Sequence, residues 1–155
     1  MTGFPADVHQ VPRRAPVPAT VLDLLDQADR GLAEAAVLPD AGDAYVAAHL
    51  AALRAAAAVV AARGRPEPTA RGRSRIRSVW EVLPEIAPEL AEWSTLFAES
   101  AVRRARIDAG IRRAADLREA AELRRAAGFF LRLVESMLVG RPAPRTGEPG
   151  GPPPK

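Results

Sequence analysis

The segment 43–63 is apolar on every side of a helix rather than along one stripe. It contains eleven alanines, and apart from its two ends its only charged residue is Arg54. Alanine is the strongest helix former, and Asp43 is predicted to be the N-cap. A helix that is apolar all round is either enclosed by other helices or spans a membrane, and His49 and Arg54 would be costly within a bilayer. We therefore predict a buried central helix and no transmembrane segment.

Within this segment, the larger apolar residues repeat at three- and four-residue spacing and predict the main buried stripe. They are Val46, Leu50, Leu53, Ala57 and Val60. A second stripe with the same kind of spacing lies beside the first. It consists of Tyr45, His49, Ala52 and Ala56. Gly64 is predicted to end the helix, because glycine is common just after a helix.

Three other stretches repeat apolar residues in the same way and predict amphipathic helices. In chain order, they cover residues 20–38, 88–108 and 117–139. Thr20 is predicted to cap the first helix, and Asp116 with Glu119 forms a capping box before the last one. Pro88 suits the first position of the third helix, and Gly140 suits the end of the fourth.

Ser78 and Glu81 form another capping box, which opens a short helical turn that Pro84 is predicted to interrupt. The whole pattern predicts an all-α fold, an antiparallel four-helix bundle with a short extra helix in the crossover. The ends of the chain are rich in proline and have no apolar periodicity, which predicts disorder. The expected divisions are a disordered tail at 1–19, the bundle at 20–139 with a basic loop at 64–77, and a second disordered tail at 140–155.

Composition narrows the chemistry mainly by what is absent. The sequence has no cysteine, which excludes disulfides and thiolate metal sites, and it has no glycine-rich phosphate loop. His9 and His49 are the only histidines, and no Glu-x-x-His motif is present, so neither a two-histidine metal site nor a di-iron bundle is expected. The first residues lack the basic and apolar pattern of a secretory leader. We expect a cytoplasmic protein without a cofactor, a metal ion or a membrane partner.

The net charge of +3 is concentrated in one segment. Residues 63–77 carry six arginines and one glutamate, or +5, which exceeds the net charge of the whole chain. Arginines in a loop broken by proline and glycine attract phosphates while the backbone adapts to the ligand. The predicted RNA- or nucleotide-binding residues are Arg65, Arg71, Arg73, Arg75 and Arg77. The alternative is a solvated linker in a sequence that is rich in arginine throughout.

Four aromatic or titratable residues form a candidate pocket. They are Tyr45, His49, Trp80 and Trp93. Histidine titrates near neutral pH, and tryptophan can stack on a nucleotide base. The alternative is that these side chains fill the core, where a tryptophan can close the end of a bundle. No catalytic residue is assigned, because His49 has no carboxylate or second histidine nearby in the sequence.

Three strings, AHLAALRAAAAV at 48–59, SVWE at 78–81 and APELAEW at 87–93, carry a resemblance to a known family. With the basic loop between them, residues 20–139 resemble a small actinobacterial family of the HEPN superfamily, the higher-eukaryote and prokaryote nucleotide-binding helical domains. The resemblance implies an antiparallel helical bundle. Many HEPN proteins are metal-independent ribonucleases with an R-x4–6-H motif, often completed across a dimer. Others are non-catalytic partners of a nucleotidyltransferase or members of toxin–antitoxin pairs.

The ribonuclease motif is absent from this sequence. The positions where its arginine would precede His49 are Gly42, Asp43 and Ala44, and no arginine precedes His9. We therefore expect a non-enzymatic HEPN-like module that binds RNA or nucleotide through the arginine loop. One alternative is a protein-interaction module, either a homodimer or the partner of another protein. Another alternative is a degenerate ribonuclease that uses His49 with an arginine from a different helix.

Overall fold

The computed structural model describes residues 16–64, 77–111 and 113–140. This part of the chain contains five α-helices, one 3-10 helix and no strand. In chain order these are α1 (Ala19–Val37), α2 (Ala41–Arg63), α4 (Val79–Ile86), η1 (Pro88–Leu90), α5 (Ala91–Asp108) and α6 (Leu117–Val139). The predicted all-α fold class is confirmed. The predictions for most of the two tails and of the basic loop concern residues outside the described ranges.

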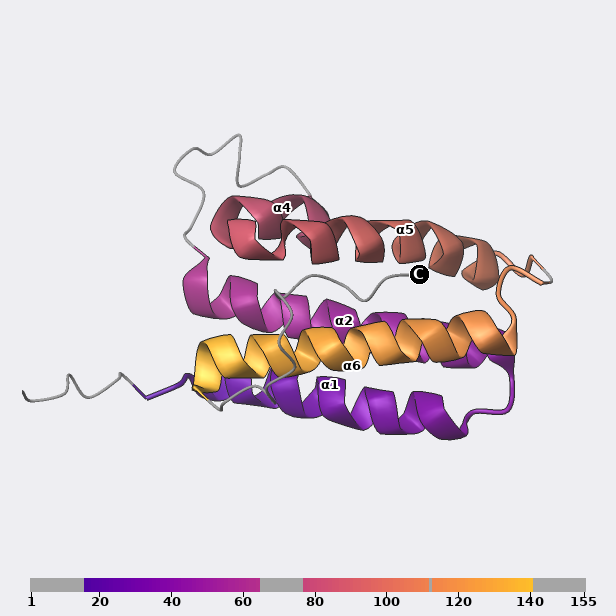
Figure 1. The fold of residues 1–155 in the computed structure, drawn as a ribbon, viewed down its shortest axis with the longest axis horizontal. Coiled ribbons are helices and arrows are strands. Elements are labelled where there is room, and N and C mark those ends of the chain that lie inside the picture. The colour runs from indigo at the N-terminus through magenta and orange to yellow at the C-terminus, as the bar shows by residue number, and fades with distance from the viewer. Residues whose placement is uncertain (1–15, 65–76, 112, 141–155) are drawn as a thin grey trace, which may run out of the picture.

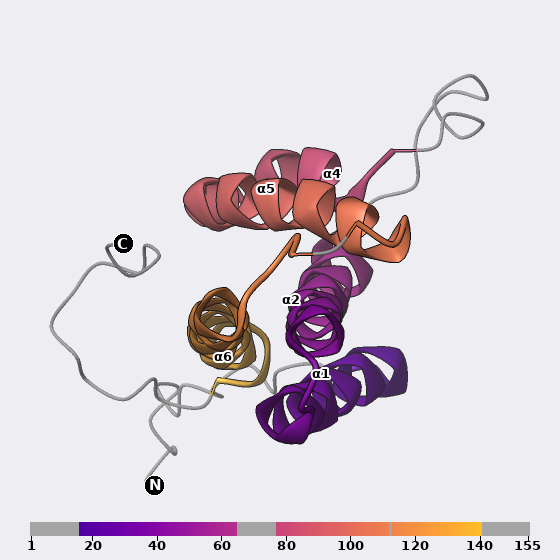
Figure 2. The ribbon, with the colours of Figure 1, turned by 90° about the vertical axis from the view of Figure 1, so that its right-hand side faces the viewer.

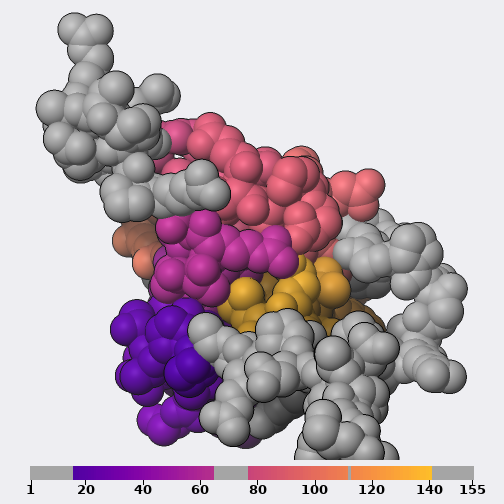
Figure 3. All heavy atoms as spheres, turned by 90° about the vertical axis from the view of Figure 1, so that its left-hand side faces the viewer, coloured from indigo at the N-terminus to yellow at the C-terminus, as the bar shows by residue number. Residues whose placement is uncertain are grey.

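Helix α2 occupies the centre of the fold. It contacts α1, α4, α5 and α6, whereas the backbones of α5 and α6 approach each other little, and these two helices meet through large side chains such as Phe97 and Phe130. Successive long helices run in opposite directions, and α1, α2 and α6 lie along the long axis of the molecule (Figure 1). Seen along that axis, α6 lies between α1 and α5, and α4 and α5 lie together over another face of α2 (Figure 2). The last turns of α2 and α6 meet the start of α1 at one end (Figure 3).

The deepest face of α2 is its alanine face, which reverses the predicted order of the two stripes. All four residues of the second predicted stripe, including Tyr45 and His49, are buried. The residues of the predicted main stripe are only half-buried: Val46, Leu50, Leu53, Ala57 and Val60. Neighbouring helices approach at the small residues, since a Cβ on Gly31 of α1 would lie 3.5 Å from the Cβ of Ala51. The larger side chains project beyond this line of close contact.

The ends of α2 and α6 test the predicted capping chemistry. The capping box of Asp116 and Glu119 is present, and Gly140 ends α6 with a φ of 74°. At α2, the cap is Asp40, whose carboxylate accepts a hydrogen bond from the amide of Asp43 at 2.9 Å. The prediction of Asp43 as the N-cap is therefore wrong, because a better placed carboxylate precedes it by three residues.

Two other helix ends differ from the prediction. Helix α1 begins at Ala19, directly after Pro18, so Thr20 is already helical and no side chain caps the helix. Gly64 follows α2 in an extended conformation, with φ −65° and ψ 146°, and does not use the left-handed region. A Cβ at Gly64 would lie 2.4 Å from the carbonyl oxygen of Val60, so glycine is required there for space.

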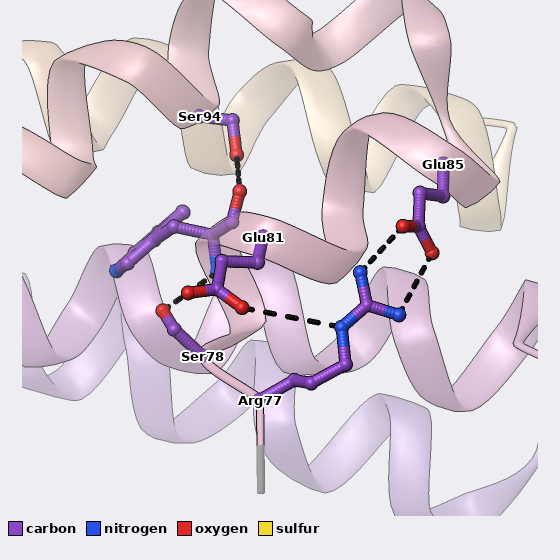
Figure 4. Close-up of polar contacts among 6 residues, drawn as sticks. Arg77, Ser78, Glu81, Glu85 and Ser94 are labelled. Atoms are coloured by element: carbon purple, nitrogen blue, oxygen red, sulfur yellow. Dashed lines mark hydrogen bonds and ion pairs between the residues drawn. The ribbon is translucent and has the colours of Figure 1, made fainter. Parts of the chain in front are cut away.

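Helix α4 begins with a side-chain cap and contains a proline. Ser78 accepts a hydrogen bond from the amide of Trp80 at 3.2 Å. Pro84 lies inside the helix, contrary to its predicted interrupting role, but has no N–H to donate to the carbonyl of Trp80 four residues earlier. The hydroxyl of Ser94 in α5 donates to that carbonyl at 2.7 Å and replaces the missing bond (Figure 4). A gap in the backbone bonding of one helix is filled by its neighbour.

Helix α2 is long and apolar enough to cross a membrane, judged by length and composition alone. Its most apolar window has a mean hydropathy of 1.6, and 56% of that window is buried against the rest of the fold. A helix surrounded by others has the same composition, so the packing of α1, α4, α5 and α6 around α2 accounts for its apolar character.

Candidate functional site

Two arginines bracket the predicted binding loop, and carboxylates engage both of them. Arg63 donates to Glu89, and this hydrogen bond lowers the pKa of the Glu89 carboxyl. Arg77 pairs with Glu85 and lies 3.9 Å from a carboxylate oxygen of Glu81 (Figure 4). These carboxylates compete with any phosphate for Arg77. The other predicted binding residues lie outside the described ranges: Arg65, Arg71, Arg73 and Arg75.

His49 is enclosed in the core, with 2% of its surface exposed. Its Nδ1 lies 2.7 Å from Oγ of Ser100, whose hydroxyl donates to the carbonyl of Phe97 at 3.0 Å. Both contacts are satisfied together when Nδ1 carries the proton and donates to Ser100. Burial, with a smaller contribution from Arg104 and against the charge of Asp108, lowers the pKa of His49 to about 4. The imidazole is neutral at pH 7 and shielded from solvent.

Trp80 and Trp93 belong to an aromatic cluster in the core. Both are buried, and the centres of their rings lie within 6.4 Å of those of Phe97 and Phe130. The edge of the buried histidine ring also meets Trp80, at a centre-to-centre distance of 5.9 Å. The structure thus brings three of the four predicted pocket residues together without a pocket between them. Tyr45 is the fourth, and it lines a cavity.

A cavity of about 680 Å³ opens between α5 and α6, and we call it the α5–α6 cleft. Its apolar floor includes Tyr45, whose pKa is raised by burial. On its rim Arg103 pairs with Glu119, and Arg118 pairs with Glu122 at 3.1 Å. The guanidinium of Arg103 also lies over the Tyr45 ring, 5.6 Å from its centre. Three arginines and three glutamates line this cleft, so its charges balance.

A second hollow, of about 410 Å³, lies between α1 and α6, and we call it the α1–α6 groove. Asp29 is the single carboxylate among the described residues that line it. Arg124, Arg125 and Arg132 line it too, and no carboxylate of the described chain lies within 4.0 Å of these three. Phe129 stands between the groove and the cleft, and the guanidinium of Arg132 lies 4.8 Å from its ring centre.

The sequence analysis missed this groove, although the chain carries a signal for it. Phe129 falls outside the apolar stripe of α6, and Arg125 and Arg132 lie four residues before and three residues after it. A helix places residues at this spacing on one face. The signal is therefore an aromatic residue off the buried stripe with arginines beside it on its own face.

Three acidic residues of the described chain stabilise helix ends. Asp40 and Asp116 cap helices, and Glu119 bonds both the cap of α6 and Arg103. Within the described ranges, no three histidine, cysteine, aspartate or glutamate side chains could together hold a metal ion.

Comparison with known proteins gives a family match. The family model described as SAV_6107-like HEPN matches residues 35–135, more than half of the 155-residue chain. The match includes all of α2, α4 and α5 and most of α6. No curated protein and no solved structure matches the chain. The resemblance to HEPN domains is thereby confirmed, and the chain belongs to the SAV_6107-like HEPN family.

Proposed function

We propose that this protein is a non-catalytic HEPN-like module, an antiparallel four-helix bundle with a short extra helix, that binds single-stranded RNA or a nucleotide through its basic loop. The observation that carries the proposal is the charge of +5 in residues 63–77 of a chain whose net charge is +3. Ion pairs of Arg63 with Glu89 and of Arg77 with Glu85 anchor both ends of this segment to one side of the fold.

The environment of His49 supports the non-catalytic part of the proposal. A histidine that acts as general acid or base must reach its substrate and titrate near the working pH. The ring of His49 is enclosed, bonded to Ser100, and has a pKa of about 4. Arg104 is the arginine of another helix whose charge acts on this ring, but Arg104 is itself paired with Asp108 at 3.4 Å. A ribonuclease built on this pair would need both groups exposed to RNA.

RNA binding is tested by fluorescence anisotropy with a short labelled single strand, titrated at several salt concentrations. In the loop variant, glutamine replaces Arg65, Arg71, Arg73 and Arg75. We expect this variant to bind at least about tenfold more weakly and with a flatter salt dependence, because each lost phosphate contact lowers the salt slope by about one.

The matched control loses the same number of arginines, and its four are exposed and remote from the loop in sequence. In the control variant, glutamine replaces Arg30, Arg106, Arg113 and Arg118. It has the same net charge as the loop variant, so a general charge effect would weaken both equally. Equal weakening, or wild-type affinity in the loop variant, would contradict the proposal.

The nuclease alternative is tested with end-labelled RNA and gel electrophoresis. We expect the RNA to stay intact during long incubation with the wild-type protein, since the described chain offers no exposed histidine for acid–base chemistry. RNA cleavage by the wild type that is lost in a folded His49→Gln variant would overturn the non-catalytic assignment.

Protein interaction is a second candidate function, favoured by exposed apolar side chains around the turn from α5 to α6. Val102, Ile111 and Leu117 expose 57%, 54% and 64% of their surfaces. Such residues mark contacts with a second copy or with another protein, for example a nucleotidyltransferase or a toxin–antitoxin partner. Size-exclusion chromatography with light scattering tests the homodimer. A monomer at all concentrations that copurifies with no protein would exclude this candidate.

A further inference from the structure

The α1–α6 groove has an exposed aromatic ring at its edge. Phe129 exposes 45% of its surface, whereas the aromatic residues that cluster around Trp80 in the core are buried. A half-exposed phenylalanine leaves part of its ring open to a planar ligand. Arg132 already lies against this ring at 4.8 Å, so a stacked base would meet both an aromatic and a guanidinium surface.

Charge distinguishes the groove from the other surfaces of the molecule. Arg124, Arg125 and Arg132 face a single carboxylate, Asp29, which leaves an excess of two positive charges. Arg77 at the start of α4 and Arg103 and Arg118 at the α5–α6 cleft are each paired with a glutamate. A phosphate at the groove therefore needs to displace no ion pair of the described structure.

The size and floor of the groove suit one base and its phosphates. Its volume of about 410 Å³ lies in the range of small-molecule sites. Leu32, Ala33 and Ala36 of α1 form an apolar floor against which a base edge can pack. Asp29 can accept a hydrogen bond from an exocyclic amino group of a base, so this carboxylate can also contact the ligand.

We propose that the α1–α6 groove binds an unpaired base of single-stranded RNA, stacked on Phe129, with the neighbouring phosphates held by Arg124 and Arg132. A duplex keeps its bases stacked on one another and cannot offer one to the ring, so the single strand is the form that fits. The ligand class rests on the proposed function, but the site is separate. The ion pairs of the loop lie on the α4 and η1 side of α2, whereas the groove is formed by α1 and α6.

The test uses the full chain and a short single-stranded RNA that contains 2-aminopurine, whose fluorescence is quenched when the base stacks. We expect quenching with the wild type and with Phe129→Tyr, and its loss with Phe129→Ala. Removal of one stacking contact should weaken binding by about fivefold or more, with an unchanged salt slope. Exchange of Arg124 and Arg132 for glutamine should instead lower the salt slope by about two.

Leu22→Ala is the matched control, because Leu22 is an apolar residue of α1 with the same exposure as Phe129, 45%, and lies outside the groove. It should bind and quench like the wild type. Circular dichroism melting shows whether each variant is folded, and the arginine variant keeps the test decisive if Phe129→Ala does not fold. Quenching that persists in Phe129→Ala, or a salt slope unchanged in the arginine variant, would overturn the proposal.

The outcomes separate this proposal from the one for the loop. Loss of quenching in Phe129→Ala with normal affinity in the loop variant supports the groove and contradicts the loop. Weak binding by the loop variant with normal quenching in Phe129→Ala contradicts the groove and leaves the loop standing. Free AMP that binds as tightly as the RNA would overturn the assignment to a strand.

Discussion

The two hollows on either side of α6 are both lined by arginines, but these arginines differ in whether they pair with a carboxylate. In the α5–α6 cleft, Arg103 pairs with Glu119 and Arg118 with Glu122, while Arg125 lines both hollows. In the α1–α6 groove, the described structure gives Arg124, Arg125 and Arg132 no such partner. The number of arginines in a region therefore says little about ligand binding. What matters is whether carboxylates already hold them.

The difference follows from the way the neighbouring helices meet α6. Helix α1 packs against α6 directly, so apolar side chains hold these two helices together. The backbones of α5 and α6 approach each other less, and large side chains join these helices: Trp93 and Phe97 pack on Phe130, and Arg103 pairs with Glu119. The ion pairs therefore lie where the helix backbones are farther apart, whereas the arginines of the groove have no carboxylate partner in the described structure.

Acidification should affect the cleft side most strongly. His49 is hydrogen-bonded to Ser100, which lines the cleft. The pKa of His49 is about 4 in the folded state and near its usual value of 6.5 in the unfolded state. The unfolded state therefore binds the proton first, and the free energy of unfolding should fall by about 3 kcal/mol between pH 6.5 and pH 4. Urea denaturation across this range measures the loss. In His49→Gln this contribution should vanish, and parallel pH profiles for the two proteins would refute its assignment to His49.

Ser94→Ala should weaken the α5 wall of the cleft and leave the groove unaffected. The substitution leaves the carbonyl of Trp80 without its donor, at an expected cost of about 1–3 kcal/mol. Pro84→Ala restores an N–H to α4, so the cost of Ser94→Ala should shrink in that background. Chemical denaturation of both single variants and the double variant measures the coupling. Additive effects would show that Ser94 does not act through the backbone gap at Pro84.

Arginine substitutions should separate the two hollows by stability. Arg103→Ala removes an ion pair and the contact with the Tyr45 ring, which should cost about 0.5–1 kcal/mol for these partly exposed groups. Arg132→Ala on the groove side should change stability by less than about 0.5 kcal/mol. Thermal melts of the two variants test the contrast. Equal destabilisation would remove the distinction between structural and available arginines.

Gly128→Ala should give the smallest change and should stabilise the protein by about 0.5 kcal/mol, because alanine is the better helix former. A Cβ at Gly128 would meet Arg132 at 3.8 Å and Leu32 at 4.0 Å, which are ordinary contacts. The added methyl would line the groove, so RNA quenching should also be measured. A lower melting temperature would show that the groove floor has less room than the distances indicate.

Helices were the most predictable part of this protein, because their signals are local. The capping box at Asp116 and the stop at Gly140 depend on neighbours within a few residues, and both are present. The family assignment also followed from contiguous strings. The cap of α2 was placed at Asp43 because that residue directly precedes the alanine run, while the chain begins its helical turn three residues earlier, at Asp40.

The packing of α2 and the candidate site depend on helices far apart in the sequence, and these were harder to predict. The size of Leu50 and Leu53 suggested that they face the core. The close approach of α1 and other helices to α2 instead favours small residues on the buried face of α2. His49 and Trp80 suggested a pocket by residue type, yet burial against other helices makes them part of the core. The groove forms where α1 and α6 meet, and only its α6 side has a signal in the sequence, at Phe129.

The bond between Ser94 and the carbonyl of Trp80 has a consequence for motion. Helix α4 cannot satisfy its own backbone without α5, so the two should protect their amides together in native-state hydrogen exchange. Opening of this pair as one cooperative unit would require Trp93 and Phe97 to separate from Phe130 of α6. Such an opening would expose the aromatic cluster at Trp80 and Trp93 to solvent.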